Sequence, residues 1–411
     1  MANLTSKFIA AVAEPTGVWE KIIMAFHGGI HNYAWAVIVF TLVLKLVLLP
    51  LDFLNKWITQ KNTRIQAVIQ PELAKLQKQY GANKQVLNQK TMELYKKNNY
   101  NVTGSCIIML VNLALTMFIF ITLFSGLNSM AAYKNAKQYN EIQKSYYSAA
   151  DYGIDDIKNK YKSYFEEYVS KPENLDADGK YNEALAHAYA KEETKKLLNN
   201  TNAVESEVAT KNANALEKYK QVKESWLWID NIWKSDTPWT SSVASFDEYV
   251  AGAKIKFSEE KITVNEKEIA IKGEDLKDLA KVEYETIMNP IRDSAGRANG
   301  YLIIVILATG ANLLSMLIMQ GKIKFKRKKK NDLQPEEEKQ KQPGGLLMMI
   351  LIPALMLYIT LTYNAVFGLY ILMGSVFGIA TTPLINWLIK VCEKRAQNKK
   401  PKESVSYSRK K

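Results

Sequence analysis

A lysine stands inside the first long apolar run of the chain, where a charged group has chemical consequences. The run, YAWAVIVFTLVLKLVLLPLDF, extends from Tyr33 to Phe53 and contains Lys45. About 20 apolar residues let a helix cross the ~30 Å hydrocarbon core of a membrane, and Lys45 would lie about 18 Å along that helix. An ammonium group at this depth is costly unless it meets water or a polar partner. We interpret Lys45 as the cation of a hydrated groove; the alternative is that it snorkels, or pairs with Asp52 on the same helical face.

Small polar side chains recur at helical spacing in other apolar runs and would give the groove hydrogen-bonding groups. Any one of these stripes is better explained by packing between helices, where a hydrogen bond contributes only ~0.6 kcal/mol on average. Several stripes together with a buried cation favour a polar interior. The candidate groove residues are Lys45, Thr41, Ser105, Asn112, Thr116, Asn312, Ser375 and Thr382.

The sequence contains no pattern typical of covalent catalysis. It has no Ser/His/Asp set and no phosphate-binding glycine loop, and its two cysteines, Cys106 and Cys392, do not form a CxxC motif. His27 and His31 have the i, i+4 spacing of metal ligands, but the two glycines between them argue against a continuous helix. We therefore expect no enzyme activity, no cofactor and no metal site.

The elements that position Lys45 must be membrane spans. The chain is 47% hydrophobic, and no charged residue occurs between Lys97 and Lys134, between Arg297 and Lys322, or between Lys341 and Lys390. The last stretch would make a helix of about 72 Å, too long for one span, and Thr362-Tyr363-Asn364-Ala365 offers a break. We therefore predict an all-α polytopic membrane protein with a core of five transmembrane helices, a cytoplasmic helical hairpin and a large, mostly helical extracytoplasmic insertion.

The predicted segments follow one another in this order: an extracytoplasmic amphipathic segment at 1–31, the first span at 32–54, the cytoplasmic helical hairpin at 55–105, the second span at 106–127, the extracytoplasmic insertion at 128–299, the third span at 300–320, a basic cytoplasmic loop at 321–344, the fourth span at 345–363, the fifth span at 367–389, and a basic cytoplasmic tail at 390–411.

Lysine and arginine set the orientation of these spans, because cytoplasmic loops carry an excess of positive charge. Basic residues outnumber acidic ones by 9 to 3 in residues 51–105, by 9 to 4 in 321–342 and by 9 to 2 in 390–411, whereas 131–300 has 25 basic and 30 acidic residues. The N-terminus and the insertion are therefore expected outside and the C-terminus in the cytoplasm. The net charge of +14 is mainly a topology signal, and we expect no direct DNA binding.

Between the spans the sequence predicts further local structure. Apolar residues recur at helical spacing before and after Gly81-Ala82-Asn83, which indicates two helices joined by a turn, with Pro71 kinking or restarting the first. Residues 131–222 have helical spacings. The stretch FSEEKITVNEKEIAIKGEDL, from Phe257 to Leu276, alternates as one or two strands do.

Four segments resemble the YidC/Oxa/Alb family of membrane-protein insertases. They are FTLVLKLVLLPL (40–51), QPELAKLQKQY (70–80), LYKKNNYNVTGSC (94–106) and WLWIDNIWKSDTP (226–238). The resemblance covers roughly residues 15–130, 225–239 and 300–395. It implies a five-helix core around a hydrophilic groove that is open to the cytoplasm and to lipid, in the bacterial plasma membrane.

The sequence departs from the family pattern at the groove and outside it. Where the family has an arginine in the first span, this chain has Lys45, which keeps the charge but loses the planar fork. Asn112 stands in place of the family's glutamine. The segment between spans two and three is usually short in the family but about 170 residues long here; it is either surface of low specificity or a domain that docks a partner or substrate.

The resemblance implies a membrane protein insertase and chaperone that receives hydrophobic segments of nascent membrane proteins and releases them into the lipid bilayer. The Sec translocon, and the ribosome through the basic loops and tail, are further partners that it suggests. The rival is a small-solute transporter or channel with Lys45 as an anion site. Transporters commonly carry internal repeats, and we find none among the five spans.

The charge partition predicts which segments an impermeant reagent reaches. A cysteine placed at Ser206 should react from outside intact cells, and a cysteine at Ser404 should react only after permeabilisation. Labelling of the residue 404 cysteine from outside would contradict the five-span topology.

Overall fold

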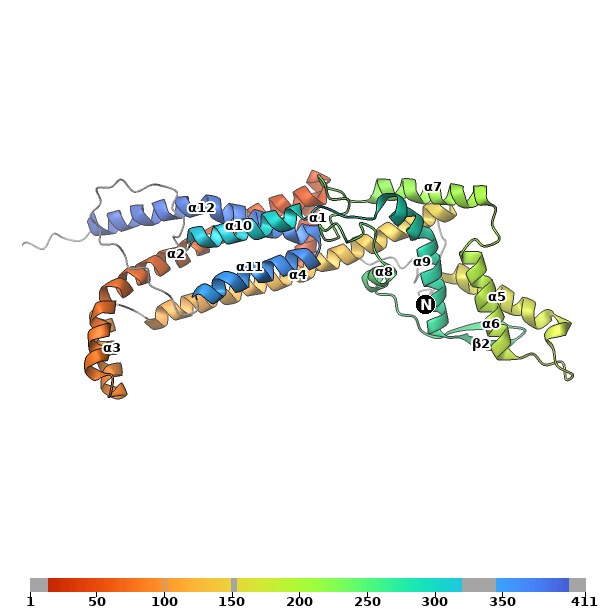
Figure 1. The fold of residues 1–411 in the computed structure, drawn as a ribbon, viewed down its shortest axis with the longest axis horizontal. Coiled ribbons are helices and arrows are strands. Elements are labelled where there is room, and N and C mark those ends of the chain that lie inside the picture. Colours follow the sequence, from red (N-terminus) through yellow and green to blue (C-terminus); the bar gives the residue numbers. More distant parts are fainter. Residues whose placement is uncertain (1–13, 99, 101, 149–153, 320–344, 399–411) are drawn as a thin grey trace, which may run out of the picture. The chain divides into compact units, whose positions relative to one another are not determined.

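The computed structural model describes residues 14–98, 100, 102–148, 154–319 and 345–398. Within these ranges the chain is overwhelmingly helical, and its two strands form one antiparallel pair (Figure 1). The basic loop at 321–344 and the end of the tail, 399–411, lie outside the described residues. The elements are α1 (Val18–Ile30), α2 (Tyr33–Tyr80), α3 (Lys84–Lys97), α4 (Val102–Tyr147), α5 (Ile154–Ser170), η2 (Pro172–Asn174), α6 (Glu183–Leu198), α7 (Glu205–Val222), α8 (Phe246–Ala253), β1 (Glu260–Val264), β2 (Lys267–Ile271), α9 (Gly273–Ala295), α10 (Ile303–Met319), α11 (Gly345–Thr362) and α12 (Ala365–Asn398).

The chain forms two compact units, and each is described by itself. The first unit comprises Met1–Val37, Phe124–Ile306 and Leu357–Leu369. The second unit comprises Ile38–Leu123, Leu307–Met356 and Tyr370–Lys411. All the candidate groove residues belong to the second unit.

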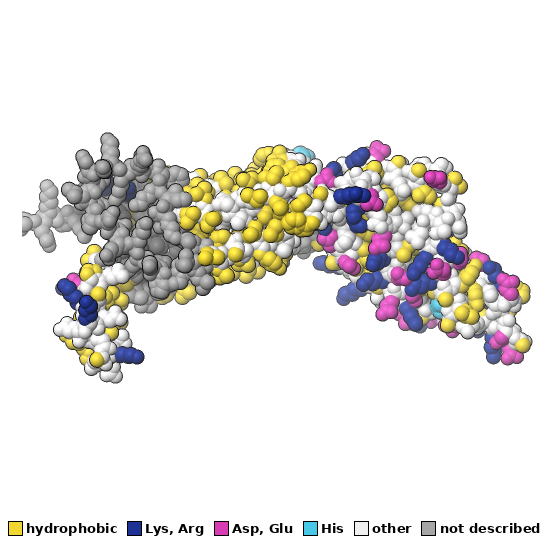
Figure 2. Space-filling view, viewed as in Figure 1, with side chains coloured by type: hydrophobic (Ala, Val, Ile, Leu, Met, Phe, Trp, Pro, Cys, Tyr) yellow, Lys and Arg dark blue, Asp and Glu magenta, His cyan; other side chains and the backbone are white. Residues whose placement is uncertain are grey.

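The apolar helices are long enough for a membrane protein. Three segments of the described chain, Tyr33–Asn62, Leu110–Tyr147 and Ala365–Cys392, have the length and hydropathy of membrane spans, and Ile303–Ile318 and Ile350–Thr362 are shorter apolar helices. Many of their large apolar side chains are exposed on the protein surface, among them Val47 at 69% and Phe118 at 63%. Figure 2 shows hydrophobic side chains massed over these helices and charged ones gathered over the helices of the first unit. The all-α membrane class is therefore confirmed.

Two helices extend well past the predicted ends of their spans. α2 has 48 residues and contains both Pro50 and Pro71, so Pro71 does not restart the helix as the sequence suggested. α4 has 46 residues and extends about 20 residues into the predicted insertion. A change from apolar to polar residues marks the edge of a membrane, but it does not end a helix when no glycine or proline signal accompanies it.

The predicted two-helix hairpin is present at the end of α2. The helix stops at Tyr80, and Asn83 caps α3 by accepting a hydrogen bond from the backbone N–H of Val86 at 3.2 Å. Leu76 of α2 and Leu94 of α3 line one shallow pocket, so the two arms face each other. Charged residues of both helices, Glu72, Lys75, Lys90, Glu93 and Lys97, line the rest of this pocket.

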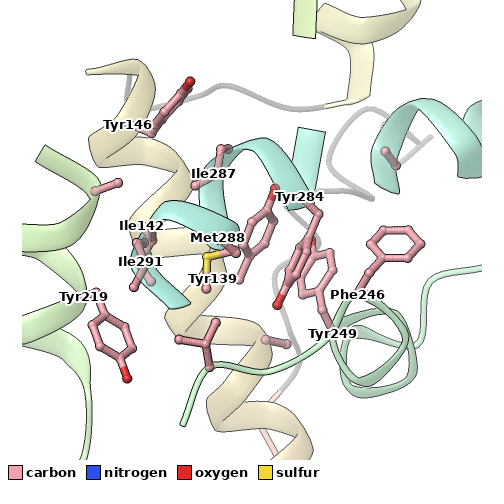
Figure 3. Close-up of a cluster of buried hydrophobic side chains, with 14 residues drawn as sticks. Tyr139, Ile142, Tyr146, Tyr219, Phe246, Tyr249, Tyr284, Ile287, Met288 and Ile291 are labelled. Carbon is pink, nitrogen blue, oxygen red and sulfur yellow. The ribbon is translucent and has the colours of Figure 1, made fainter. Parts of the chain in front are cut away.

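Three buried tyrosines form the centre of the first unit (Figure 3). Tyr139 of α4 lies 4.4 Å from Tyr249 of α8 and 4.5 Å from Tyr284 of α9, measured between ring centroids. The Tyr284 hydroxyl donates to the Ala244 carbonyl at 2.7 Å, and burial raises the pKa of Tyr284 above its usual value. The end of α4 is therefore part of the core of the inserted domain, and the domain has a hydrophobic centre of its own.

The predicted strands are also confirmed. β1 and β2 pair antiparallel through the two-residue turn Asn265-Glu266, in which both residues have positive φ, as tight hairpin turns require. Ile269 and Ile271 of β2 are buried against Tyr161 and Phe165 of α5.

The loop between α7 and α8 organises the start of α10. Asp236 is almost fully buried and accepts hydrogen bonds from the backbone N–H groups of Tyr301 at 2.9 Å and Ile304 at 2.7 Å. Gly300 is required here, because a Cβ at this position would lie 1.8 Å from Asp236 Oδ1. Asn299 fastens the same loop through hydrogen bonds from its side chain to the carbonyls of Asn231 and Ser235, both at 2.8 Å.

The Asp236 cap makes a prediction about stability. Asp236→Ala leaves buried N–H groups without acceptors, which should lower the free energy of unfolding by about 1–3 kcal/mol. Thermal unfolding of the full chain in detergent measures the loss. Asp293→Ala is the control, because its side chain is 69% exposed and pairs only with Arg297; it should have an effect within about 0.5 kcal/mol. Equal effects of the two substitutions would contradict the capping role.

Candidate functional site: a cation between two apolar helices

Lys45 lies against α12. Its side chain is partly buried, and a Cβ built on Gly374 would lie 3.2 Å from Lys45 Cε and 3.9 Å from its Nζ. Because Gly374 has no side chain, the aliphatic part of Lys45 can pack closely against α12 at this position. Ser375, the next residue, is buried, and so is Thr41, one turn before Lys45. Buried hydroxyl-bearing residues of both helices thus lie close in sequence to this contact, while Leu46 is exposed on the apolar surface.

A second polar contact joins the same two helices further along. Lys56 Nζ donates to Thr382 Oγ1 at 3.2 Å, and Gln60 Nε2 donates to Asn386 Oδ1 at 2.9 Å. The partners advance by four residues on each helix, so α2 and α12 run parallel at this contact. Thr382 also donates to the Gly378 carbonyl of its own helix at 2.7 Å.

Sequence reasoning missed Lys56 and Gln60 because they were assigned to the hairpin. A signal was present: Lys45, Asp52 and Lys56 are spaced i, i+7 and i+11, which places them on one helical face. The polar face continues past the end of the apolar run, but the predicted groove ended with that run and so left out these two residues.

α10 reaches α12 through small residues. Ser315 Oγ would lie 3.3 Å from a Cβ at Gly378, so the hydroxyl-bearing face of α10 meets the glycine-bearing face of α12. Thr309 Oγ1 is buried without a hydrogen-bond partner among the described atoms. The interior of the second unit therefore holds polar atoms beyond those that pair with one another.

The remaining candidates are distributed less closely. Asn112 and Asn312 are partly buried and Thr116 is exposed, and within the described part of the chain no hydrogen bond links them to Lys45. Ser105 belongs to α4, but its side chain lies outside the described residues. The structure thus places Lys45 at Gly374, the residue before Ser375, and the unpredicted Lys56 at Thr382, eleven residues further along α2.

This arrangement can bind and orient, and it shows no chemistry of bond cleavage. No group of three or more His, Cys, Asp or Glu side chains suited to a metal occurs in the described residues. A lysine ammonium acts as a point charge that attracts carboxylates and polar groups, and hydroxyls beside it supply hydrogen bonds.

The comparisons with known proteins each match part of the chain. The family model described as "60Kd inner membrane protein" matches residues 25–174. A membrane protein insertase YidC of Fusobacterium nucleatum is 32% identical over 125 residues, which are 30% of this chain and 54% of the relative. One of Clostridium perfringens is 32% identical over 124 residues, 28% of this chain and 50% of the relative.

The chain spans about half the full length of each of these two relatives. The family-model match includes Thr41, Lys45, Lys56, Asn112 and Thr116, and it ends before α10 and α12. No solved structure matches the chain at a significant level.

The Lys56 contact predicts a measurable coupling between α2 and α12. In a double-mutant cycle, Lys56→Met and Thr382→Val should be coupled by about 0.6 kcal/mol, and by no more than about 1.7 kcal/mol. Unfolding in mixed micelles measures it. Thr381→Val is the matched control, because the Thr381 hydroxyl donates to the Phe377 carbonyl of its own helix at 2.8 Å. Equal coupling for both threonines would refute the interhelical bond.

Proposed function

We propose that this chain, which belongs to the YidC/Oxa/Alb family, is a membrane protein insertase. It receives hydrophobic segments of nascent membrane proteins in a polar groove of the second unit and releases them into the bilayer. The observation that carries this proposal is the position of Lys45, a cation that packs against Gly374, next to the buried Ser375, between two apolar helices that also carry small polar side chains.

The proposed mechanism is electrostatic. A hydrated groove shortens the hydrocarbon path for a polar flank, and the Lys45 ammonium attracts acidic residues in that flank. The hydrophobic part of the segment then moves into lipid, driven by about 25 cal/mol for each Å² of apolar surface removed from water. The hydroxyl groups of Ser375 and Thr382 supply hydrogen bonds in place of some that the polar flank loses when it leaves water.

The five-span topology belongs to the same proposal. The three long apolar helices and the two shorter ones supply five segments, and the charge bias places the N-terminus and the inserted domain outside and the C-terminus in the cytoplasm. The hairpin of α2 and α3 is the proposed receiving surface on the cytoplasmic side. The Sec translocon and the ribosome are proposed partners through the basic segments. No observation in the described residues favours the anion transporter.

Substitution of Lys45 tests the mechanism in cells depleted of their own insertase. Lys45→Arg should support growth, because the charge is kept. Lys45→Glu should fail for substrates with acidic translocated flanks, because attraction becomes repulsion. Lys45→Leu should leave the bundle as stable or more stable, since it removes a buried charge, but should impair insertion. Growth and substrate insertion are measured at matched expression.

The control is Lys61→Glu, an exposed lysine on the same helix, which should be tolerated. Full growth with Lys45→Glu would exclude the electrostatic groove while leaving the fold intact. Silent behaviour of Lys45→Leu would favour snorkelling. Flux of small anions into liposomes that contain the purified chain, without insertion of a test protein, would favour the transporter instead.

A further inference from the structure

A tight turn after α7 holds a leucine in an unfavourable backbone conformation at the surface. Trp226 and Ile229 exchange backbone hydrogen bonds of 3.0 and 2.9 Å, which closes a turn around Leu227 and Trp228. Leu227 has φ 52° and is 70% exposed. The left-handed region is unfavourable for a residue with a Cβ, and turns normally place Gly or Asn there.

The turn is continuous with the first apolar helix. The Trp226 ring lies 5.8 Å from the Trp35 ring in an edge-to-face contact, and 6.0 Å from the Trp228 ring. Trp35 is half-exposed and lies within the span segment Tyr33–Asn62. Figure 1 shows the loop that follows α7 running beside the beginning of α2. Leu227 is thus displayed next to the end of a membrane helix.

The same loop is tied to the start of α10. The Trp228 indole N–H donates to Asp236 at 3.4 Å, and Asp236 caps the first turn of α10. Tyr301, directly before that helix, is 70% exposed, and Trp239 is 68% exposed. Aromatic side chains at the ends of apolar helices are typical of the membrane–water interface. Exposed apolar side chains therefore cluster where two proposed spans begin.

We propose that the Trp226–Ile229 turn inserts Leu227 into the lipid leaflet at the starts of α2 and α10, with Trp239 and Tyr301 at headgroup level. The occupant of this surface is phospholipid: its acyl chains contact Leu227 and its polar layer contacts the two aromatic rings. Burial of the exposed Leu227 side chain among acyl chains removes apolar surface from water and so offsets the cost of its backbone conformation. The proposal requires that α2 and α10 span the membrane, and it does not depend on insertase activity.

Spin labelling tests the proposal in the full chain. Cys106 and Cys392 are replaced by serine, a single cysteine is introduced by Leu227→Cys, and the labelled protein is reconstituted into phosphatidylcholine vesicles. Collision with oxygen, which concentrates in lipid, is compared with collision with a water-soluble nickel chelate. The control is Leu185→Cys on α6, where the native leucine is 55% exposed.

The label at residue 227 should collide with oxygen several-fold more, relative to nickel, than the label at residue 185. Equal nickel access at both positions would overturn the proposal. If Leu227→Cys does not fold, the same comparison at Trp239→Cys decides it: a label there should report a depth at the headgroups, and one as accessible to nickel as the label at 185 would again overturn the proposal.

Discussion

Hydrocarbon offers no hydrogen-bond partners, so a polar group among apolar helices must find its partner inside the protein. This constraint explains the second unit. Lys56 and Gln60 are bonded to α12, and Lys45 has its stem fitted to the space above Gly374. Glycines and small hydroxyl residues on α12 bring the neighbouring helices close enough for such contacts.

Sequence alone could predict what depends on local pattern. The apolar runs, the break before Ala365, the turn at Gly81 to Asn83 and the strand pair were all visible in periodicity and turn residues. Lys45 stood out because a charge in an apolar run is costly. The pairing of Lys56 with Thr382 was not visible, because the residues are 326 positions apart and only the packing of α2 on α12 brings them together.

Helix ends were the other limit of the sequence. Hydropathy predicted a second span ending at residue 127, but α4 continues to Tyr147 and supplies Tyr139 to the core of the inserted domain. In the same domain, Glu224 is held between Lys134 at 3.1 Å and the Trp233 indole at 2.6 Å. Burial raises the pKa of Glu224, and the Lys134 charge opposes that rise. The Lys134–Glu224 contact joins residues 90 positions apart, which no local pattern records.

The cap of α10 has a consequence for the order in which the chain is made. Asp236 precedes by 65 and 68 residues the two N–H groups from which it accepts hydrogen bonds. A ribosome therefore makes Asp236 before it makes α10. Synthesis runs from the N-terminus at about 5–20 residues per second. Several seconds therefore separate the synthesis of the Trp226–Pro238 loop from that of α10. Asn299, which fastens this loop, is made directly before α10, so the loop and the first turn of α10 assemble together, and Gly300 lets that turn approach the Asp236 carboxylate.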